Sequence, residues 1–353
     1  MITVEPLNVE ARSGAKAPIG EPMLRIEHVE KSFPATLSFA ALLRAGGRVP
    51  RRRVLQSIDF CVGRGELFGL LGANGAGKTS LLKMLATLSI PDRGRITLDG
   101  VDVVREPLKA KRRIGLCTAE ERSFYFRLTG RANLMFFGAL AGLRGPFLRQ
   151  RVEEVFSLVD LTSAIDRSFH SYSSGMRQRL TVARALLADP DVVFLDEPTR
   201  AVDPVHADGL RRLIRDELVN KRGKTIVLAT NLLEEAWALC DRIAVIDRGT
   251  VVAIGSPESL GKALHERMLY RLDVDEISDA QMERLRSTVG VVYARVLTRD
   301  ASTTRLEVAV AGDLALRALF AVLASDGLRL RAFRSIEPDP MEIFRHVTGG
   351  EAP

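Results

Sequence analysis

The sequence of 353 residues contains only three cysteines and no long apolar run. Cys61, Cys117 and Cys240 are scattered and show no spacing typical of a metal site, so we expect reduced thiols in a cytosolic protein. No apolar stretch approaches the roughly 20 residues that span a bilayer. The first six residues also lack a basic-then-apolar signal pattern. If this protein works at a membrane, we expect another chain to supply the channel.

Neither sign of charge is in large excess. Lysine and arginine number 51 and aspartate and glutamate 44, which gives a net charge of +7. This surplus fits anionic neighbours such as nucleic acid, acidic lipid headgroups or nucleotides, and it equally fits mere solubility. The hydrophobic content of 46% is ordinary for a globular protein. The chain is long enough for more than one domain.

One glycine-rich stretch carries the strongest chemical pattern. Residues 72–79 read G-x-x-x-x-G-K-T, after the apolar run 67–71 and before residues 81–85, which have helical spacing. Strand, glycine loop and helix are the context of a P-loop. Glycines let successive backbone N–H groups point into one concavity, and the helix N-terminus adds donors and partial positive charge. The predicted phosphate-binding residues are Gly72, Ala73, Asn74, Gly75, Ala76, Gly77, Lys78, Thr79 and Ser80.

Two loop residues and two distant acids predict the chemistry. Lys78 offers a point charge to the β- and γ-phosphates, and Thr79 offers a hydroxyl to Mg²⁺. The segment 191–197 contains the apolar run 192–195 and ends in Asp196 and Glu197. It suits a buried parallel strand, whose C-terminal end is where such sheets bind ligands. We expect Asp196 to hold Mg²⁺, directly or through water, and Glu197 to polarise the attacking water. An ordinary strand end with two surface acids is the weaker alternative beside a P-loop.

The rest of the chain divides by pattern. Strands are expected in alternating or apolar segments, a mostly helical subdomain over about 106–188, and an N-cap at Thr129. Residues 268–335 read strand, helix, strand, strand, helix, strand, which is a ferredoxin-like order. The remaining expectations are a mobile tail at 1–22, strands at 23–29, 54–60, 96–100, 225–230 and 242–246, and a helix at about 339–348.

An unusual insert occupies residues 34–53. Leu37, Phe39, Leu42 and Leu43 give it an apolar face, and five arginines follow. Such a segment could lie against acidic headgroups, but a solvated surface hairpin is the favoured interpretation. Phe33, just before the insert, fits core packing or an aromatic face for adenine, and taken alone its pattern favours the core.

The order of these motifs resembles the ATP-binding subunits of ABC transporters, over about residues 23–260. Residues 72–79 match the Walker A motif, and 192–197 match Walker B with its catalytic glutamate. Residues 201–204 lie where the D-loop belongs and contain Asp203. The segment 172–179 resembles the signature motif, with Ser173, Ser174, Gly175 and Met176.

The resemblance implies a fold and an assembly. The fold would be α/β, a P-loop NTPase with a RecA-like parallel sheet, an antiparallel β subdomain, a helical subdomain and a small α+β C-terminal domain over 265–353. Phe33 falls at the adenine-stacking position. A helix starting near Met176 would cap, through Ser173 and Gly175, the γ-phosphate bound by a partner subunit. Two chains would then close head to tail around ATP.

Two positions depart from the family pattern. No glutamine follows the strand near 113–117, where Glu120 or Glu121 could hold Mg²⁺ or water instead. Asn231 stands where the family usually has histidine. Asparagine can bridge the γ-phosphate to Glu197 but carries no proton charge near neutral pH. We therefore predict retained ATP binding and slowed or altered hydrolysis.

These features predict the ATPase subunit of an ABC exporter, using ATP and Mg²⁺ and resembling the drug, antibiotic and polysaccharide export type. It would dimerise with itself or a homologous ATPase and sit on the cytoplasmic face of the cell membrane through a separate permease, with inner-leaflet contact through the insert. Two alternatives remain open. A soluble ABC ATPase acting on nucleic acid or ribosomes fits the basic charge, although such relatives usually carry two P-loops and this chain has one. An ATP-binding regulator with impaired hydrolysis fits Asn231 but not Glu197.

Overall fold

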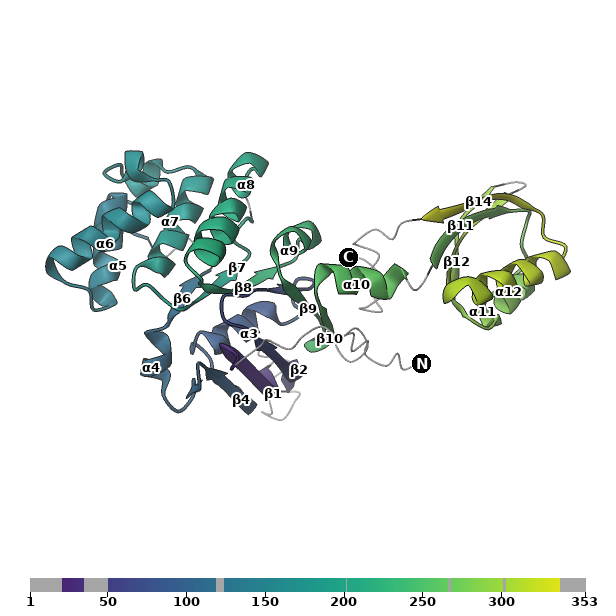
Figure 1. Cartoon of the computed structure of the whole chain (residues 1–353), viewed down its shortest axis with the longest axis horizontal. Coiled ribbons are helices and arrows are strands. Elements are labelled where there is room, and N and C mark those ends of the chain that lie inside the picture. The colour runs from purple at the N-terminus through teal and green to yellow at the C-terminus, as the bar shows by residue number, and fades with distance from the viewer. Residues whose placement is uncertain are drawn as a thin grey trace, which may run out of the picture. The chain divides into compact units, whose positions relative to one another are not determined.

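The structure is a computed structural model that describes residues 21–34, 50–118, 124–200, 202–265, 268–300 and 303–336. Contacts divide the chain into two compact units, Met1–Pro257 and Glu258–Pro353 (Figure 1). Each unit has a hydrophobic core of its own. The expectations for residues 1–20, the insert residues 35–49, Glu120 and Glu121, and the helix at 339–348 lie outside the described residues.

A six-stranded sheet forms the centre of the first unit, in the order β10-β9-β3-β8-β7-β6. Five strands run parallel, and β10 at the edge is antiparallel. Every residue of β3, β7 and β8 is buried, as continuous apolar runs covered on both faces require. The strands are β3 (Leu67–Leu71), β6 (Ile114–Cys117), β7 (Val192–Asp196), β8 (Thr225–Thr230), β9 (Arg242–Asp247) and β10 (Thr250–Gly255).

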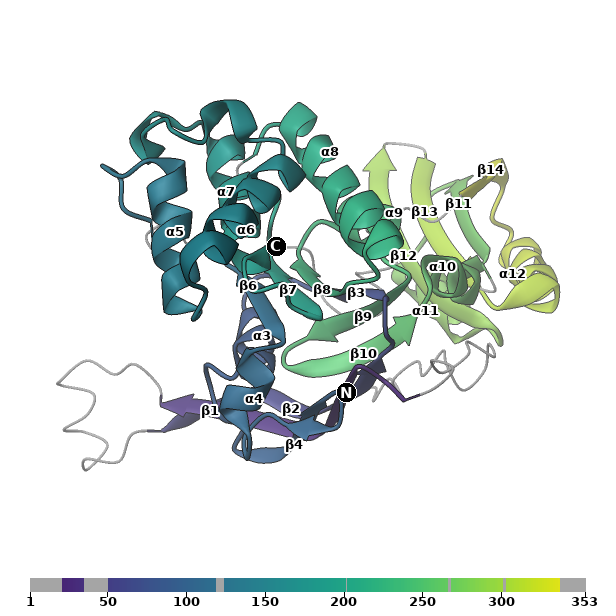
Figure 2. The ribbon, with the colours of Figure 1, turned by 60° about the vertical axis from the view of Figure 1, so that its left-hand side comes forward.

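A second sheet is antiparallel and lies beyond helix α3 (Lys78–Leu85). Its strands, in the order β2-β1-β4-β5, are β2 (Arg51–Val62), β1 (Leu24–Pro34), β4 (Arg93–Leu98) and β5 (Val101–Asp102). Apolar side chains from both sheets and α3 pack into one core. Figure 2 shows α3 lying between the two sheets. β1 is longer than expected: Phe33 lies within it and pairs with Arg52 of β2. The ends of the predicted insert therefore belong to the sheet.

Helices cover the central sheet and form a separate group beside it. Figure 1 shows α3 on one face, and α8 and α9 on the other. α5, α6 and α7 pack on one another, and Thr129 caps α5 through a 3.1 Å bond from the backbone N–H of Ala132, as predicted. The helices are α4 (Pro107–Lys111), α5 (Gly130–Leu140), α6 (Gly145–Leu158), α7 (Ser174–Leu186), α8 (Pro204–Arg212), the π-helical Leu213–Lys221, α9 (Leu233–Leu239) and α10 (Pro257–His265), with 3-10 turns Thr162–Ala164 and Phe169–Ser171.

Two details of the helical prediction need correction. The range 106–188 contains β6, which pairs with β7 in the central sheet, so the helical group begins only after that strand. α7 begins at Ser174 rather than near Met176, because the Ser173 hydroxyl accepts the backbone N–H of Met176 and caps the helix two residues earlier. Within the described residues, no helix has the length and apolar character needed to cross a bilayer.

The second unit is a four-stranded antiparallel sheet with two helices. Its element order is the one predicted, and its strand order β12-β13-β11-β14 is that of a split β-α-β fold. Buried residues of both helices and of alternate strand positions form its core. The elements are β11 (Met268–Val274), α11 (Asp279–Ser287), β12 (Val291–Asp300), β13 (Thr303–Val310), α12 (Gly312–Ser325) and β14 (Leu330–Ile336).

Candidate active site

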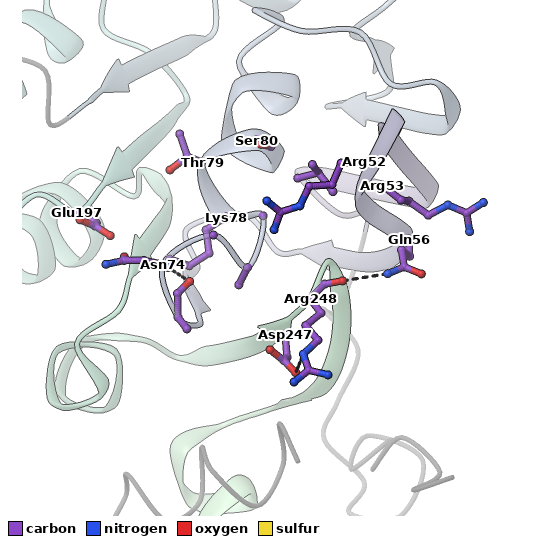
Figure 3. A pocket seen from close by; sticks show the side chains of 15 residues that line it. Arg52, Arg53, Gln56, Asn74, Lys78, Thr79, Ser80, Glu197, Asp247 and Arg248 are labelled. Carbon is purple, nitrogen blue, oxygen red and sulfur yellow. Dashed lines mark hydrogen bonds and ion pairs between the residues drawn. The ribbon is translucent and has the colours of Figure 1, made fainter. Parts of the chain in front are cut away.

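The glycine-rich stretch forms the loop between β3 and α3. Gly77 caps α3 with φ of 113°, a conformation that favours glycine. A Cβ at Gly72 would lie 2.3 Å from the backbone oxygen of Ile246, so the loop packs tightly on β9. The loop lines a cavity of about 670 Å³ (Figure 3). Its size suits a nucleotide-scale ligand.

Lys78 lies inside the loop with its ammonium against the loop's own carbonyl groups. Its Nζ atom donates to the backbone oxygens of Gly72 at 2.6 Å and Ala73 at 3.1 Å. Burial lowers the pKa of Lys78, and the nearby charges of Glu197 and Asp196 oppose this shift. Because neither acid forms a direct ion pair with it among the described residues, the charge is free to pair with a polyphosphate.

The distant acid meets the loop as predicted. The Thr79 hydroxyl donates to Asp196 Oδ1 at 3.2 Å, although the residues are 117 positions apart. β8 lies between β3 and β7, and all three strands deliver their C-terminal ends to this edge. Burial, followed by the neighbouring Glu197, raises the pKa of Asp196. A hydroxyl and one carboxylate beside a phosphate loop fit Mg²⁺, which usually keeps waters and binds one or two carboxylates plus phosphate oxygens.

Glu197 follows Asp196 in a left-handed backbone conformation, with φ of 48°. Its backbone N–H donates to Ala229 O at 2.8 Å, and its carboxylate accepts from Arg200 at 2.9 Å. The side chain is 12% exposed and lines the same cavity as Lys78 and Thr79 (Figure 3). A base at this position can take a proton from water beside Thr79 at this end of the cavity.

Other predicted site residues lie outside the described lining of this cavity. Phe33 is 37% exposed, and the Lys31 ammonium lies 5.4 Å from its ring centre. Asn231 is exposed and follows β8 directly. The signature residues Ser173, Ser174, Gly175 and Met176 are at the start of α7, and Asp203 caps α8 by accepting from the backbone N–H of His206 at 3.2 Å. In the part of the chain that the structure describes, none of these groups reaches the cavity of its own nucleotide loop.

Sequence reasoning missed one wall of the cavity. It consists of Arg52, Arg53, Val54 and Gln56 of β2 and of Asp247 and Arg248 at the β9–β10 turn. Gln56 N donates to Gly249 O at 2.7 Å, and Gly249 N donates to Ala76 O at 3.0 Å, so the turn joins β2 to the loop. Tertiary pairing alone assembles this wall, and no local motif marks it.

Known proteins share both the sequence pattern and the fold. Residues 55–200 match the family model described as ABC transporter. The daunorubicin/doxorubicin resistance ATP-binding protein DrrA of Streptomyces peucetius is 38% identical over 301 residues, which cover 85% of this chain and 89% of that protein. The chain belongs to the ABC transporter family.

Other relatives agree with this membership. The linearmycin resistance ATP-binding protein LnrL of Bacillus subtilis is 32% identical over 303 residues, covering 85% of this chain and 94% of the relative. The ATP-binding cassette MJ0796, solved as a dimer with ADP and phosphate, has 22% identity and a TM-score of 0.57, covering 67% of this chain and 99% of that one. That structural likeness confirms the predicted fold. As an ABC transporter ATP-binding protein, the chain has the family's activity, ATP hydrolysis coupled to transport.

Proposed function

We propose that this ATP-binding subunit binds Mg·ATP in the described cavity and drives export through a separate permease. The observation that carries the proposal is the 3.2 Å bond between Thr79 and Asp196 beside the Lys78 ammonium. Lys78 would hold the β- and γ-phosphates, Thr79 and Asp196 the metal, and Glu197 the attacking water. Bound Mg²⁺ would neutralise charge developing on the phosphates.

Export rather than import is supported by the relatives, which are named for resistance to daunorubicin, doxorubicin and linearmycin. We propose an antibiotic-like cargo and a position on the cytoplasmic face of the membrane, held there by the permease. The start of α7, outside the chain's own cavity, supports a head-to-tail dimer in which Ser173 and Gly175 reach the partner's γ-phosphate. The helix N-terminus suits such an anion.

Calorimetry with Mg·ATP tests the binding step directly. The wild-type protein should release heat, and Lys78→Ala should lose binding because the phosphate charge then has no lysine partner. A matched control is Lys83→Ala, which removes a charge from the same helix outside the described cavity lining. Equal affinity in Lys78→Ala and wild type would contradict the proposal. Phosphate release with and without the permease would separate the transporter subunit from a binding-only regulator.

A further inference from the structure

A carboxyl group lies buried behind the segment that carries Glu197. Glu235, in the first turn of α9, is 1% exposed, and its Oε1 atom accepts a 2.7 Å hydrogen bond from the hydroxyl of Thr199. Its Oε2 atom is also buried and has no hydrogen-bond partner among the described residues. A carboxyl group kept in this state costs folding free energy, which indicates that it serves something other than stability.

The bond joins two segments that follow neighbouring strands. Thr199 lies two residues after Glu197, beyond the end of β7, and Glu235 lies four residues after Asn231, beyond the end of β8. A second bond joins the segment after β7 to β8 itself, from Glu197 N to Ala229 O at 2.8 Å. The segment with the base is therefore held at two points, to the end of β8 through its backbone and to α9 through the Thr199 side chain.

Glu197 needs such support because a non-glycine residue at φ of 48° is held there only by its surroundings. Given the proposed role of Glu197 as base, we propose that Glu235 is a positioning residue that acts through Thr199. The Thr199–Glu235 bond fixes the backbone turn after Asp196 and so fixes the Glu197 carboxylate relative to the metal end of the cavity. It also couples that turn to the segment carrying Asn231.

Turnover and binding in two variants test this role. Thr199→Val keeps the side-chain shape but removes the hydroxyl, and Glu235→Leu removes its acceptor. Each should lower kcat by about 10- to 100-fold, because a small misplacement of a catalytic group has effects of this size. The Kd for Mg·ATP should change less than about twofold, since Lys78, Thr79 and Asp196 stay in place. The double variant should be no worse than either single one, because both remove the same bond.

Conservative and matched variants separate positioning from general damage. Thr199→Ser and Glu235→Gln each keep the bond and should keep wild-type kcat. Thr181→Val is the control: this hydroxyl is also buried, at 1% exposure, and donates to Arg177 O at 3.0 Å, far along the chain from both segments. Its kcat should stay at the wild-type value.

Hydrogen exchange gives a readout that does not depend on activity. The amides of residues 196–200 should exchange faster in Thr199→Val than in wild type or Thr181→Val. Wild-type kcat with unchanged exchange in Thr199→Val would overturn the inference, and so would an equal loss of kcat and ATP affinity. Absence of Mg·ATP binding by the wild type would instead overturn the proposed function, and exchange would still test the Thr199–Glu235 bond.

Discussion

At the scale of single residues, Asn231 occupies the position after β8 where the family resemblance implies a histidine. We predict that Asn231→His raises the rate of ATP hydrolysis at pH 7.5. An imidazole can bridge the γ-phosphate to Glu197 and also carry a proton, which an amide cannot. The gain in hydrolysis rate should fade as pH falls below about 6.5, because an imidazole that is already protonated cannot accept a further proton. Steady-state phosphate release measures it, and an equal rise in Asn231→Ala would contradict the explanation.

Arg52 is a second cation in the lining of the cavity. It lines the cavity, its side chain makes no hydrogen bond or ion pair with another described residue, and it points toward the phosphate loop in Figure 3, whereas Arg53 points away. We predict that Arg52→Ala weakens Mg·ATP binding about tenfold, the effect of losing one charge-assisted hydrogen bond. Arg53→Ala removes the same net charge and should change the calorimetric Kd much less. An equal loss of affinity in the two variants would indicate only a general effect of charge.

At the scale of elements, the β9–β10 turn supports the phosphate loop through the backbone bond from Gly249 N to Ala76 O. Gly249 has φ of 81°, and a Cβ there would lie 2.1 Å from the backbone oxygen of Val54. Gly249→Ala should therefore push the turn away from β2, lower the melting temperature and weaken Mg·ATP binding. Gly223 has a similar φ of 64°, and a Cβ there would meet no described atom within 4 Å, so Gly223→Ala controls for backbone strain alone. That control should cost about 1 kcal/mol and leave the Kd unchanged.

The elements also show which parts of the fold and of the site could be predicted from the sequence. The P-loop and the acids at the end of β7 were predictable because each is a short local motif, and the parallel sheet brings their strand ends together. The strand expected near 113–117 is β6, but the range given to the helical subdomain still included it, because four residues are too few to show a period of their own. Arg52 and Arg248 reach the cavity through strand pairing and a turn, and Glu235 meets Thr199 through helix packing. Such long-range placement leaves no mark in a local pattern.

At the scale of the whole molecule, two cysteines report on opening of the folded state. Burial raises the pKa of Cys117 to about 12 and raises that of Cys240 well above its ordinary value of 9.0. At pH 8, about one Cys117 thiol in ten thousand would be ionised, so neither should react with a thiol reagent in the native protein. Cys61 is partly exposed and should react first. Mass spectrometry of timed labelling would measure this, and early modification of Cys117 would contradict the buried environment.

The raised pKa of Cys117 also makes the stability of the fold depend on pH. The unfolded Cys117 thiol ionises near 9, whereas the folded one keeps its proton up to about 12, so the folded state binds more protons between these values. The free energy of unfolding should therefore fall as pH rises through this window. In Cys117→Ala, the free energy of unfolding should fall less steeply between pH 8 and pH 10, as chemical denaturation at the two values would measure. An unchanged slope would show that another group sets the alkaline limit.

The bonds from the Arg248–Gly249 turn to Gln56 and to the Ala76 carbonyl have a consequence for timing. They hold the phosphate loop in shape without a ligand, so the entropy cost of ordering that segment falls on folding and not on each binding event. The loop would then keep its binding conformation after the product nucleotide dissociates. The interval between successive cycles would then be set by diffusion of nucleotide and by closing of the proposed dimer, since no local refolding is needed.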